Sequence, residues 1–118
     1  MYRDNNIHKN KGLNVKMKNK SALTKGIEAK LDILQRHIHI LNTLQKNEPV
    51  GIINLSKLTG YPQHTVRCSL RTLEQEGLIK PSQQGATTTD AAPDAVALLK
   101  MEVKNINKTM KEMIKTLK

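Results

Sequence analysis

The sequence predicts a mainly α-helical fold with one small β-hairpin and a long final helix. Apolar residues recur at the three- and four-residue spacings of amphipathic helices in segments 24–46, 53–59 and 62–76. Segment 78–89 breaks that rhythm and is rich in Thr near a Gln-Gln-Gly turn, which is typical of two short strands. From about residue 93 to the C-terminus the helical spacing returns without a break, which predicts the final helix.

The composition limits the size and chemistry of the core. The chain has 118 residues, of which 37% are hydrophobic, and it contains two Tyr but no Phe or Trp. This length suits one small domain with extensions, and its core must be aliphatic. A core this small often depends on a partner chain for part of its stability. The net charge of +10 favours a polyanionic partner, with nucleic acid as the first candidate.

The positive charge is concentrated at the two ends of the chain. The net charge is +6 over residues 1–30, +1 over residues 31–93 and +3 over residues 94–118. Residues 1–22 are rich in Lys and Asn, so we expect a flexible basic arm there. Such an arm either keeps the chain in solution or contacts DNA phosphates or a minor groove.

Cysteine usage and hydropathy indicate the cellular compartment. Cys68 is the single cysteine, which excludes an intrachain disulfide and fits a reducing compartment. The N-terminus lacks an apolar signal core, and no apolar run approaches the length of about 18 residues that spans a membrane. We therefore expect a soluble, cytoplasmic protein that is associated with the nucleoid.

The first predicted helix, at 24–46, carries one apolar stripe on its surface. The stripe consists of Ile27, Leu31, Leu34, Ile38, Leu41 and Leu44. Ile33 and Ile40 lie beside it and widen the face that we expect to be buried. Pro49 ends the helix because the residue before a proline avoids helical geometry. Residues 50–52 can add a short strand.

Two further helices follow with a tight turn between them. In the helix at 53–59 we expect Leu55 and Leu58 to point inward, with Gly60 capping its end. Tyr61 fills the turn, and Pro62 suits the first position of the helix at 62–76. The inner face of that helix consists of Val66, Leu70 and Leu73, and Gly77 stops it. A strand at 78–82, a turn at 83–85 and a returning strand at 86–89 complete the hairpin.

The final helix carries a heptad seam of about three repeats. The seam consists of Val96, Leu99, Val103, Ile106, Met110, Met113 and Leu117. Its simplest partner is the same helix of a second chain, which would make a homodimer through a coiled coil. The alternative is packing against the helix at 27–44. Six Lys residues, at 100, 104, 108, 111, 115 and 118, form a stripe on the outer side, which is either solvated or in contact with nucleic acid.

A short helix, a turn, a second helix and a hairpin occur in the order of a winged helix-turn-helix. In that fold the second helix, here 62–76, enters the DNA major groove. Its side opposite the apolar face carries His64, Arg67, Cys68, Arg71 and Gln75, with Gln63 at the exposed N-terminal edge. Arg and Gln form bidentate contacts with guanine and adenine, so Gln63, His64 and Arg67 are the first candidates for base contacts. Thr65 and Ser69 at the flanks suit phosphate contacts. The alternative is that Arg67 and Arg71 are only solvated charges.

The run from Thr65 to Ile79, TVRCSLRTLEQEGLI, resembles the junction of recognition helix and wing in winged-helix transcriptional regulators of archaea and bacteria. The resemblance covers roughly residues 31–92. It implies that the wing touches the DNA backbone or minor groove and that a long terminal helix forms a dimer. The implied wing contacts are Lys80, Ser82, Gln83, Gln84 and Thr87. This wing has no Arg at its tip, which argues against deep insertion into the minor groove.

The sequence favours no enzyme and no cofactor. It contains no Ser/His/Asp set, no paired buried carboxylates and no phosphate loop. His64 and Cys68 are four residues apart, but two ligands are only half of a metal site. Cys68 is an incidental thiol or a redox switch. His37 and His39 point in different directions on a helix, and no small-molecule ligand can be identified.

Together these features predict a dimeric, sequence-specific regulator of transcription that binds double-stranded DNA. We expect a basic arm at 1–22, a DNA-binding domain at 23–92 and a dimerisation helix at 93–118. Two recognition helices would enter successive major grooves of a pseudo-palindromic site. The alternatives are an architectural or DNA-segregation protein that coats DNA with low sequence preference, and a winged-helix module that binds another protein.

Overall fold

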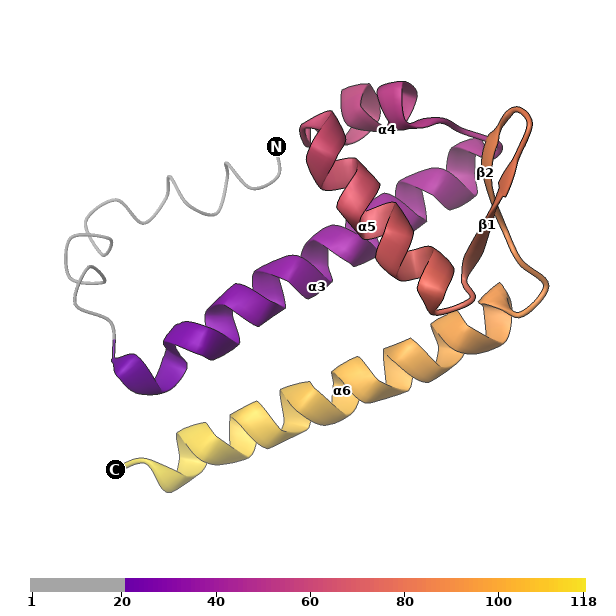
Figure 1. The fold of residues 1–118 in the computed structure, drawn as a ribbon. Coiled ribbons are helices and arrows are strands. Elements are labelled where there is room, and N and C mark those ends of the chain that lie inside the picture. The colour runs from indigo at the N-terminus through magenta and orange to yellow at the C-terminus, as the bar shows by residue number, and fades with distance from the viewer. Residues whose placement is uncertain (1–20) are drawn as a thin grey trace. The chain divides into compact units, whose positions relative to one another are not determined.

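The computed structural model describes residues 21–118, and these residues are mainly helical. In chain order they form α3 (Ala22–Asn47), α4 (Ile52–Thr59), α5 (Gln63–Gln75), β1 (Ile79–Ser82), β2 (Gly85–Thr88) and α6 (Ala92–Thr116) (Figure 1). This confirms a mainly α-helical class with a small antiparallel hairpin. All but the last two residues of the expected basic arm at 1–22 lie outside the described residues. The described residues divide inside α3, between Gln35 and Arg36, and the second unit is Arg36–Lys118.

The predicted apolar stripe of α3 is buried only in its C-terminal half. Leu41 and Leu44 are buried as expected, and Ile40, which lies beside the stripe, is completely buried. In the N-terminal half, Ile27 and Ile33 are 55% and 44% exposed. The prediction of one continuous buried face is therefore wrong, because helical periodicity indicates which residues share a face but not how much of that face is covered.

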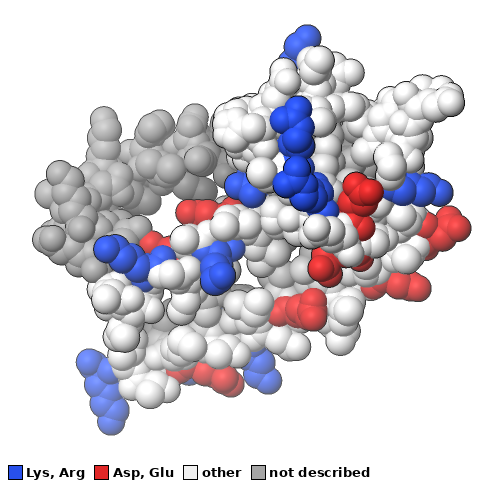
Figure 2. All heavy atoms as spheres, in the orientation of Figure 1, with Lys and Arg blue, Asp and Glu red and all other residues white. Residues whose placement is uncertain are grey.

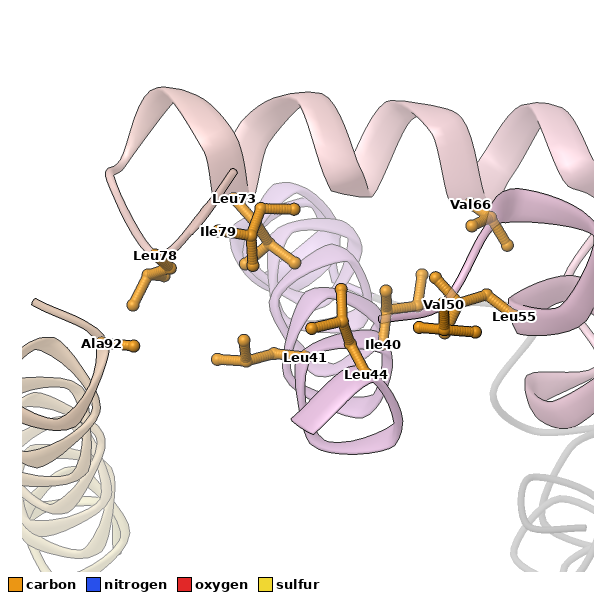
Figure 3. Packing of buried hydrophobic residues seen from close by; sticks show 10 residues of the cluster. All are labelled: Ile40, Leu41, Leu44, Val50, Leu55, Val66, Leu73, Leu78, Ile79 and Ala92. Atoms are coloured by element: carbon orange, nitrogen blue, oxygen red, sulfur yellow. The ribbon is translucent and has the colours of Figure 1, made fainter. Parts of the chain in front are cut away.

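The core of the second unit is aliphatic, as the composition predicts. Figure 3 shows Val66 and Leu73 of α5 directed toward the α3 residues Ile40, Leu41 and Leu44. The start of α6 joins this core through Ala92, which lies beside Leu78 in the figure. The buried cluster consists of Ile40, Leu41, Leu44, Val50, Leu55, Val66, Leu73, Leu78, Ile79 and Ala92.

The turn between α4 and α5 uses the predicted glycine. Gly60 adopts a left-handed conformation with a φ of 84°, and its N–H donates to the carbonyl oxygen of Ser56 at 2.8 Å. Ser56 Oγ in turn donates to the carbonyl oxygen of Tyr61 at 2.6 Å. Pro62 precedes α5 in an extended conformation and does not occupy its first helical position. The two hydrogen bonds determine the path of the chain into α5.

One of the two inward positions predicted in α4 is wrong. Leu55 is fully buried, whereas Leu58 is 55% exposed. Ile52, three residues before Leu55, packs against the core instead. Ile52 is half-buried, so Leu55 is the one fully buried side chain of this eight-residue helix.

The β1–β2 hairpin is held by a third segment of backbone. Ile79 pairs with Thr88 and Ser82 with Gly85, across a turn at Gln83 and Gln84. Val50 bridges to Ala86 through two hydrogen bonds of 3.1 and 2.8 Å. The expected strand at 50–52 is thus a single bridged residue, because Ile52 already begins α4.

Gly85 is required where this bridge forms. Its φ is 132°, and a Cβ atom there would lie 2.5 Å from the carbonyl carbon of Val50. Side chains rarely adopt that backbone conformation, and a Cβ at that distance would displace the backbone of Val50. The glycine therefore allows the hairpin to approach the segment before α4.

Helix α6 begins with residues that favour a helix N-terminus, and only its first turns contact the core. Pro93 lies in its first turn together with Asp94, whose negative charge suits the helix N-terminus. Ala95 and Val96 pack against the core, whereas every residue from 101 to 118 is exposed. In the seam, Val103 is 37% exposed, Ile106 is 42% exposed and Met113 is 56% exposed. Among residues 21–118, no helix is both long and apolar enough to cross a membrane.

Candidate nucleic-acid interface

Helix α5 has one buried face and one polar face, as its spacing predicts. Val66 and Leu73 are buried, and Leu70 is half-buried beside them. The opposite side is exposed. We call this side the outer face of α5; it consists of Gln63, His64, Arg67, Cys68, Arg71 and Gln75. Thr65, the predicted phosphate contact at the flank, is half-buried.

The outer face of α5 carries cations that are free to meet an anion. Figure 2 shows Lys and Arg side chains gathered over α5, with Asp and Glu side chains near its C-terminal end. Within residues 21–118, neither Arg67 nor Arg71 forms an ion pair with a carboxylate. Both guanidinium groups therefore keep their hydrogen-bond donors available for a partner.

Ser69 does not belong to this face, and its predicted phosphate contact is wrong. The residue is completely buried and lies three residues after Val66 and four before Leu73, on the same side of the helix. Its Oγ accepts a hydrogen bond from Nε of Arg36 at 2.9 Å. The spacing of Ser69 from Val66 and Leu73 already predicts a position on the buried face. The prediction of a phosphate contact instead followed the polar character of the hydroxyl group.

His37 completes a polar cluster around Ser69. Nδ1 of His37 lies 2.8 Å from Ser69 Oγ. Burial lowers the pKa of His37, and the positive charge of Arg36 lowers it further. A neutral imidazole can accept a hydrogen bond at Nδ1 from the Ser69 hydroxyl, while Arg36 donates a hydrogen bond to the oxygen of that hydroxyl. Among the described residues, no buried side-chain polar atom lacks a hydrogen-bond partner.

The two histidines of α3 have different surroundings, as their spacing predicts. His37 contacts Ser69, whereas the ring of His39 lies edge-on to that of Tyr61, with centroids 5.6 Å apart. Tyr61 thereby links the turn before α5 to α3. The two residues thus help to position α5 and do not form a joint ligand site.

The predicted hairpin contacts are mostly exposed. Lys80, Gln83 and Gln84 are open to a partner, and Thr87 is half-buried opposite Lys80. Ser82 is exposed, but its Oγ already donates to the carbonyl oxygen of Gly85 at 2.5 Å. Lys80 is therefore the one cation of the hairpin, and the turn at Gln83 and Gln84 is uncharged.

Glu48 and Thr88 hold the hairpin in place, a role that no pattern in the sequence indicates. Glu48 Oε1 accepts hydrogen bonds from the backbone N–H of Thr88 at 2.7 Å and from its hydroxyl at 3.0 Å. The hydroxyl of Thr89 donates to the carbonyl oxygen of Gly77 at 2.6 Å. These bonds join the hairpin both to the end of α3 and to the segment that follows α5.

A groove of about 410 Å³ lies between α5 and the hairpin. Its cations are Arg67 and Arg71 from α5 and Lys80 from β1, and Glu74 is its one acidic residue. The other lining residues are mostly apolar. They are Val50, Gly51, Ile52, Leu70, Ile79, Pro81, Ser82, Gly85 and Ala86. The groove thus brings together cations from a helix and from the strand that follows it.

The other candidate residues that the sequence suggested lie outside this groove. Within residues 21–118, no group of three or more His, Cys, Asp or Glu side chains could hold a metal ion. Cys68 is exposed and carries a free thiol. The six Lys residues of the C-terminal stripe are all exposed along α6 and beyond its end.

No protein-family model and no curated protein matches this sequence.

Proposed function

We propose that this chain is a dimeric winged helix-turn-helix regulator of transcription that binds double-stranded DNA sequence-specifically. The observation that carries the proposal is the outer face of α5, where Arg67 and Arg71 lie unpaired beside Lys80 of the hairpin. A polar, cationic helix on a rigid support is what readout of the major groove requires. Such a regulator would act in the cytoplasm, on the nucleoid.

The dimensions of α5 suit a major groove. The helix has 13 residues, which gives a length of about 20 Å, and the major groove is about 12 Å wide. Gln63, His64 and Arg67 in its N-terminal half would meet base edges, with Arg71 and Cys68 farther along. Thr65 and the hairpin residues Lys80, Gln83, Gln84 and Thr87 would contact the backbone, with Ser82 at the edge of that surface. Ser69 is excluded from the set because it is buried.

The proposed dimer forms through α6. Its seam residues Val103, Ile106 and Met110 are large, apolar and exposed, and they recur at heptad spacing. The equivalent helix of a second chain would cover them in a coiled coil. Two α5 helices would then read half-sites separated by about 34 Å or a multiple of that distance.

The six exposed Lys residues of the C-terminal stripe favour a second candidate function. They provide phosphate contacts that are independent of sequence, as expected of a protein that coats DNA with low sequence preference. The two candidates differ in the ratio of specific to nonspecific binding.

Selection of bound duplexes from a random library at about 0.15 M salt separates these candidates, since nonspecific phosphate attraction is then substantially screened. We expect a two-fold symmetric motif. Retention of DNA at low salt without any motif would favour the coating protein, and no retention at either salt would indicate a module that binds another protein.

Substitution of the outer face of α5 is the matching test. Arg67→Ala should weaken binding to the selected duplex by about 1–3 kcal/mol and relax the preference at one base position. Lys57→Ala is the matched control, because Lys57 is an exposed cation of α4 outside the proposed contact set. An unchanged base preference in the Arg67 variant would remove α5 as the recognition helix.

A further inference from the structure

The groove between α5 and the hairpin combines an apolar floor with a cationic rim. Val50 and Ile79 are buried at its base, and Ile52 and Leu70 are half-buried beside them. Arg67, Arg71 and Lys80 line the same groove and are exposed. We propose that this groove binds a small amphipathic carboxylate, with its apolar body on the floor and its anionic group on the rim.

The charges of the groove select an anion. Three cations line it against one acidic residue, Glu74. Within the described part of the chain, none of Arg67, Arg71 and Lys80 has a carboxylate partner. A guanidinium group binds a carboxylate through two parallel hydrogen bonds, and such charge-assisted bonds are stronger than neutral ones.

The floor distinguishes this ligand from a phosphate. Contacts with DNA phosphates would use the three cations, but they would leave the half-buried side chains of Ile52 and Leu70 partly in water. An apolar surface lowers the free energy of binding only when a ligand removes it from water. The complementary molecule therefore has both a hydrocarbon body and a negative charge.

The size and rigidity of the groove suit a ring system. Its volume of about 410 Å³ falls in the range of roughly 300–1,000 Å³ that is usual for small-molecule sites. Its walls are fixed by the bridge between Val50 and Ala86 and by the close approach of Gly85 to Val50. A bicyclic aromatic acid would fill this space better than acetate.

A carboxylate bound in the groove would prevent DNA binding, and this consequence rests on the proposed function. Arg67, Arg71 and Lys80 belong both to the rim and to the proposed DNA contacts. A carboxylate held there would neutralise those cations and place its ring between α5 and the hairpin. The DNA-binding unit would thus respond to a metabolite without a separate effector domain.

The direct test is titration of the full chain, without DNA, with 1-naphthylacetate, its neutral isostere 1-naphthylacetamide, and acetate. Binding is followed through amide NMR shifts. We expect a Kd on the order of 1 mM for 1-naphthylacetate, with shifts centred on Ile52, Leu70 and Ile79. The amide, which lacks the charge, and acetate, which lacks the ring, should each bind at least about ten-fold more weakly.

Two charge variants complete this test. Lys80→Gln should weaken the binding of 1-naphthylacetate by at least about three-fold. Lys57→Gln should leave it unchanged, because Lys57 does not line the groove. Equal binding of the amide, shifts centred elsewhere, or equal effects of the two variants would overturn the proposal.

Competition with the selected duplex tests the consequence separately. Displacement of DNA by 1-naphthylacetate but not by the amide would support a shared site. A carboxylate that binds the groove without displacing the duplex would overturn the blocking role. If no duplex binds at all, the regulator proposal fails, while the titration without DNA still decides whether the groove binds carboxylates.

Discussion

Ser69 Oγ lies 2.8 Å from Nδ1 of His37, on the side of α5 that faces the core. This contact joins α5 to α3 through a polar pair inside an otherwise aliphatic interface. Arg36 donates to the same hydroxyl oxygen, and a neutral imidazole at His37 can accept the hydrogen bond that the hydroxyl donates. The orientation of α5, and with it the candidate interface, is therefore linked to the protonation of one histidine.

The stability of the fold should decrease as the pH falls below about 6.5. The pKa of His37 is lowered from its ordinary value of 6.5 in the folded chain. Above pH 6.5 the imidazole is mostly neutral in both states, whereas below it the unfolded chain binds a proton that the folded chain excludes. Urea denaturation at pH 7.5 and 5.5 measures this loss. His37→Gln should reduce it, and His64→Gln, which removes an exposed imidazole, should not. Equal pH dependence in all three proteins would contradict the role of His37.

Ser69→Ala should destabilise the fold by about 1–3 kcal/mol, because it removes the shared partner of Arg36 and His37. Cys68→Ala at the adjacent exposed position is the control and should stay within about 0.5 kcal/mol of the wild type. Denaturation in urea gives both values. The DNA sequence preference of the Ser69 variant should be unchanged, and a relaxed preference would return Ser69 to the contact set.

Gly85→Ala should destabilise the fold by at least about 2 kcal/mol, because the new Cβ meets the backbone of Val50 and requires an unfavourable φ. Gly60→Ala isolates the conformational part of this effect. Gly60 also has a positive φ, but no atom beyond its own residue and its two chain neighbours lies within 4 Å of its ideal Cβ position, so we expect a loss of only about 1 kcal/mol. Equal losses of unfolding free energy in the two variants would show that the contact with Val50 does not affect stability.

Ile106→Glu should prevent dimerisation by placing a charge in the apolar seam of α6. We expect the dimer dissociation constant to rise by at least about 100-fold, since each subunit would bury an unpaired carboxylate. Lys108→Glu changes the charge on the outer side of the same helix and should leave the dimer intact. Sedimentation equilibrium measures both. A dimeric Ile106 variant would place the interface on another surface.

Local patterns in the sequence were sufficient to predict most elements of this fold. The order of α4, α5, hairpin and α6 follows from helical spacing, the stop signals at Gly60 and Gly77, and the Thr-rich segment around Gly85. The outer face of α5 follows from the same spacing. Each of these features depends on neighbouring residues, so it can be deduced without knowing how distant segments meet.

The features that the sequence did not reveal depend on contacts between distant residues. Ser69 is paired with Arg36 and His37, more than thirty positions away. Glu48 binds Thr88 across forty positions, and the bridge between Val50 and Ala86 defines one wall of the groove. The exposure of Leu58 and Ile27 has the same origin, because apolar spacing does not tell which part of a helix finds a neighbour.

Under the proposed pairing of α6, the exposed length of this helix would make the activity of the protein depend on the protein concentration. Residues 101–118 are all exposed, and a helix without tertiary contacts is only marginally stable in water. By mass action, the proposed dimer would stabilise this helix more as the protein concentration rises. Under the proposed function, single subunits would each bind one half-site weakly at low protein concentration, whereas paired subunits would bind both half-sites together at high concentration. The response to synthesis of the protein would then be steeper than linear, and dilution at cell division would be enough to weaken it.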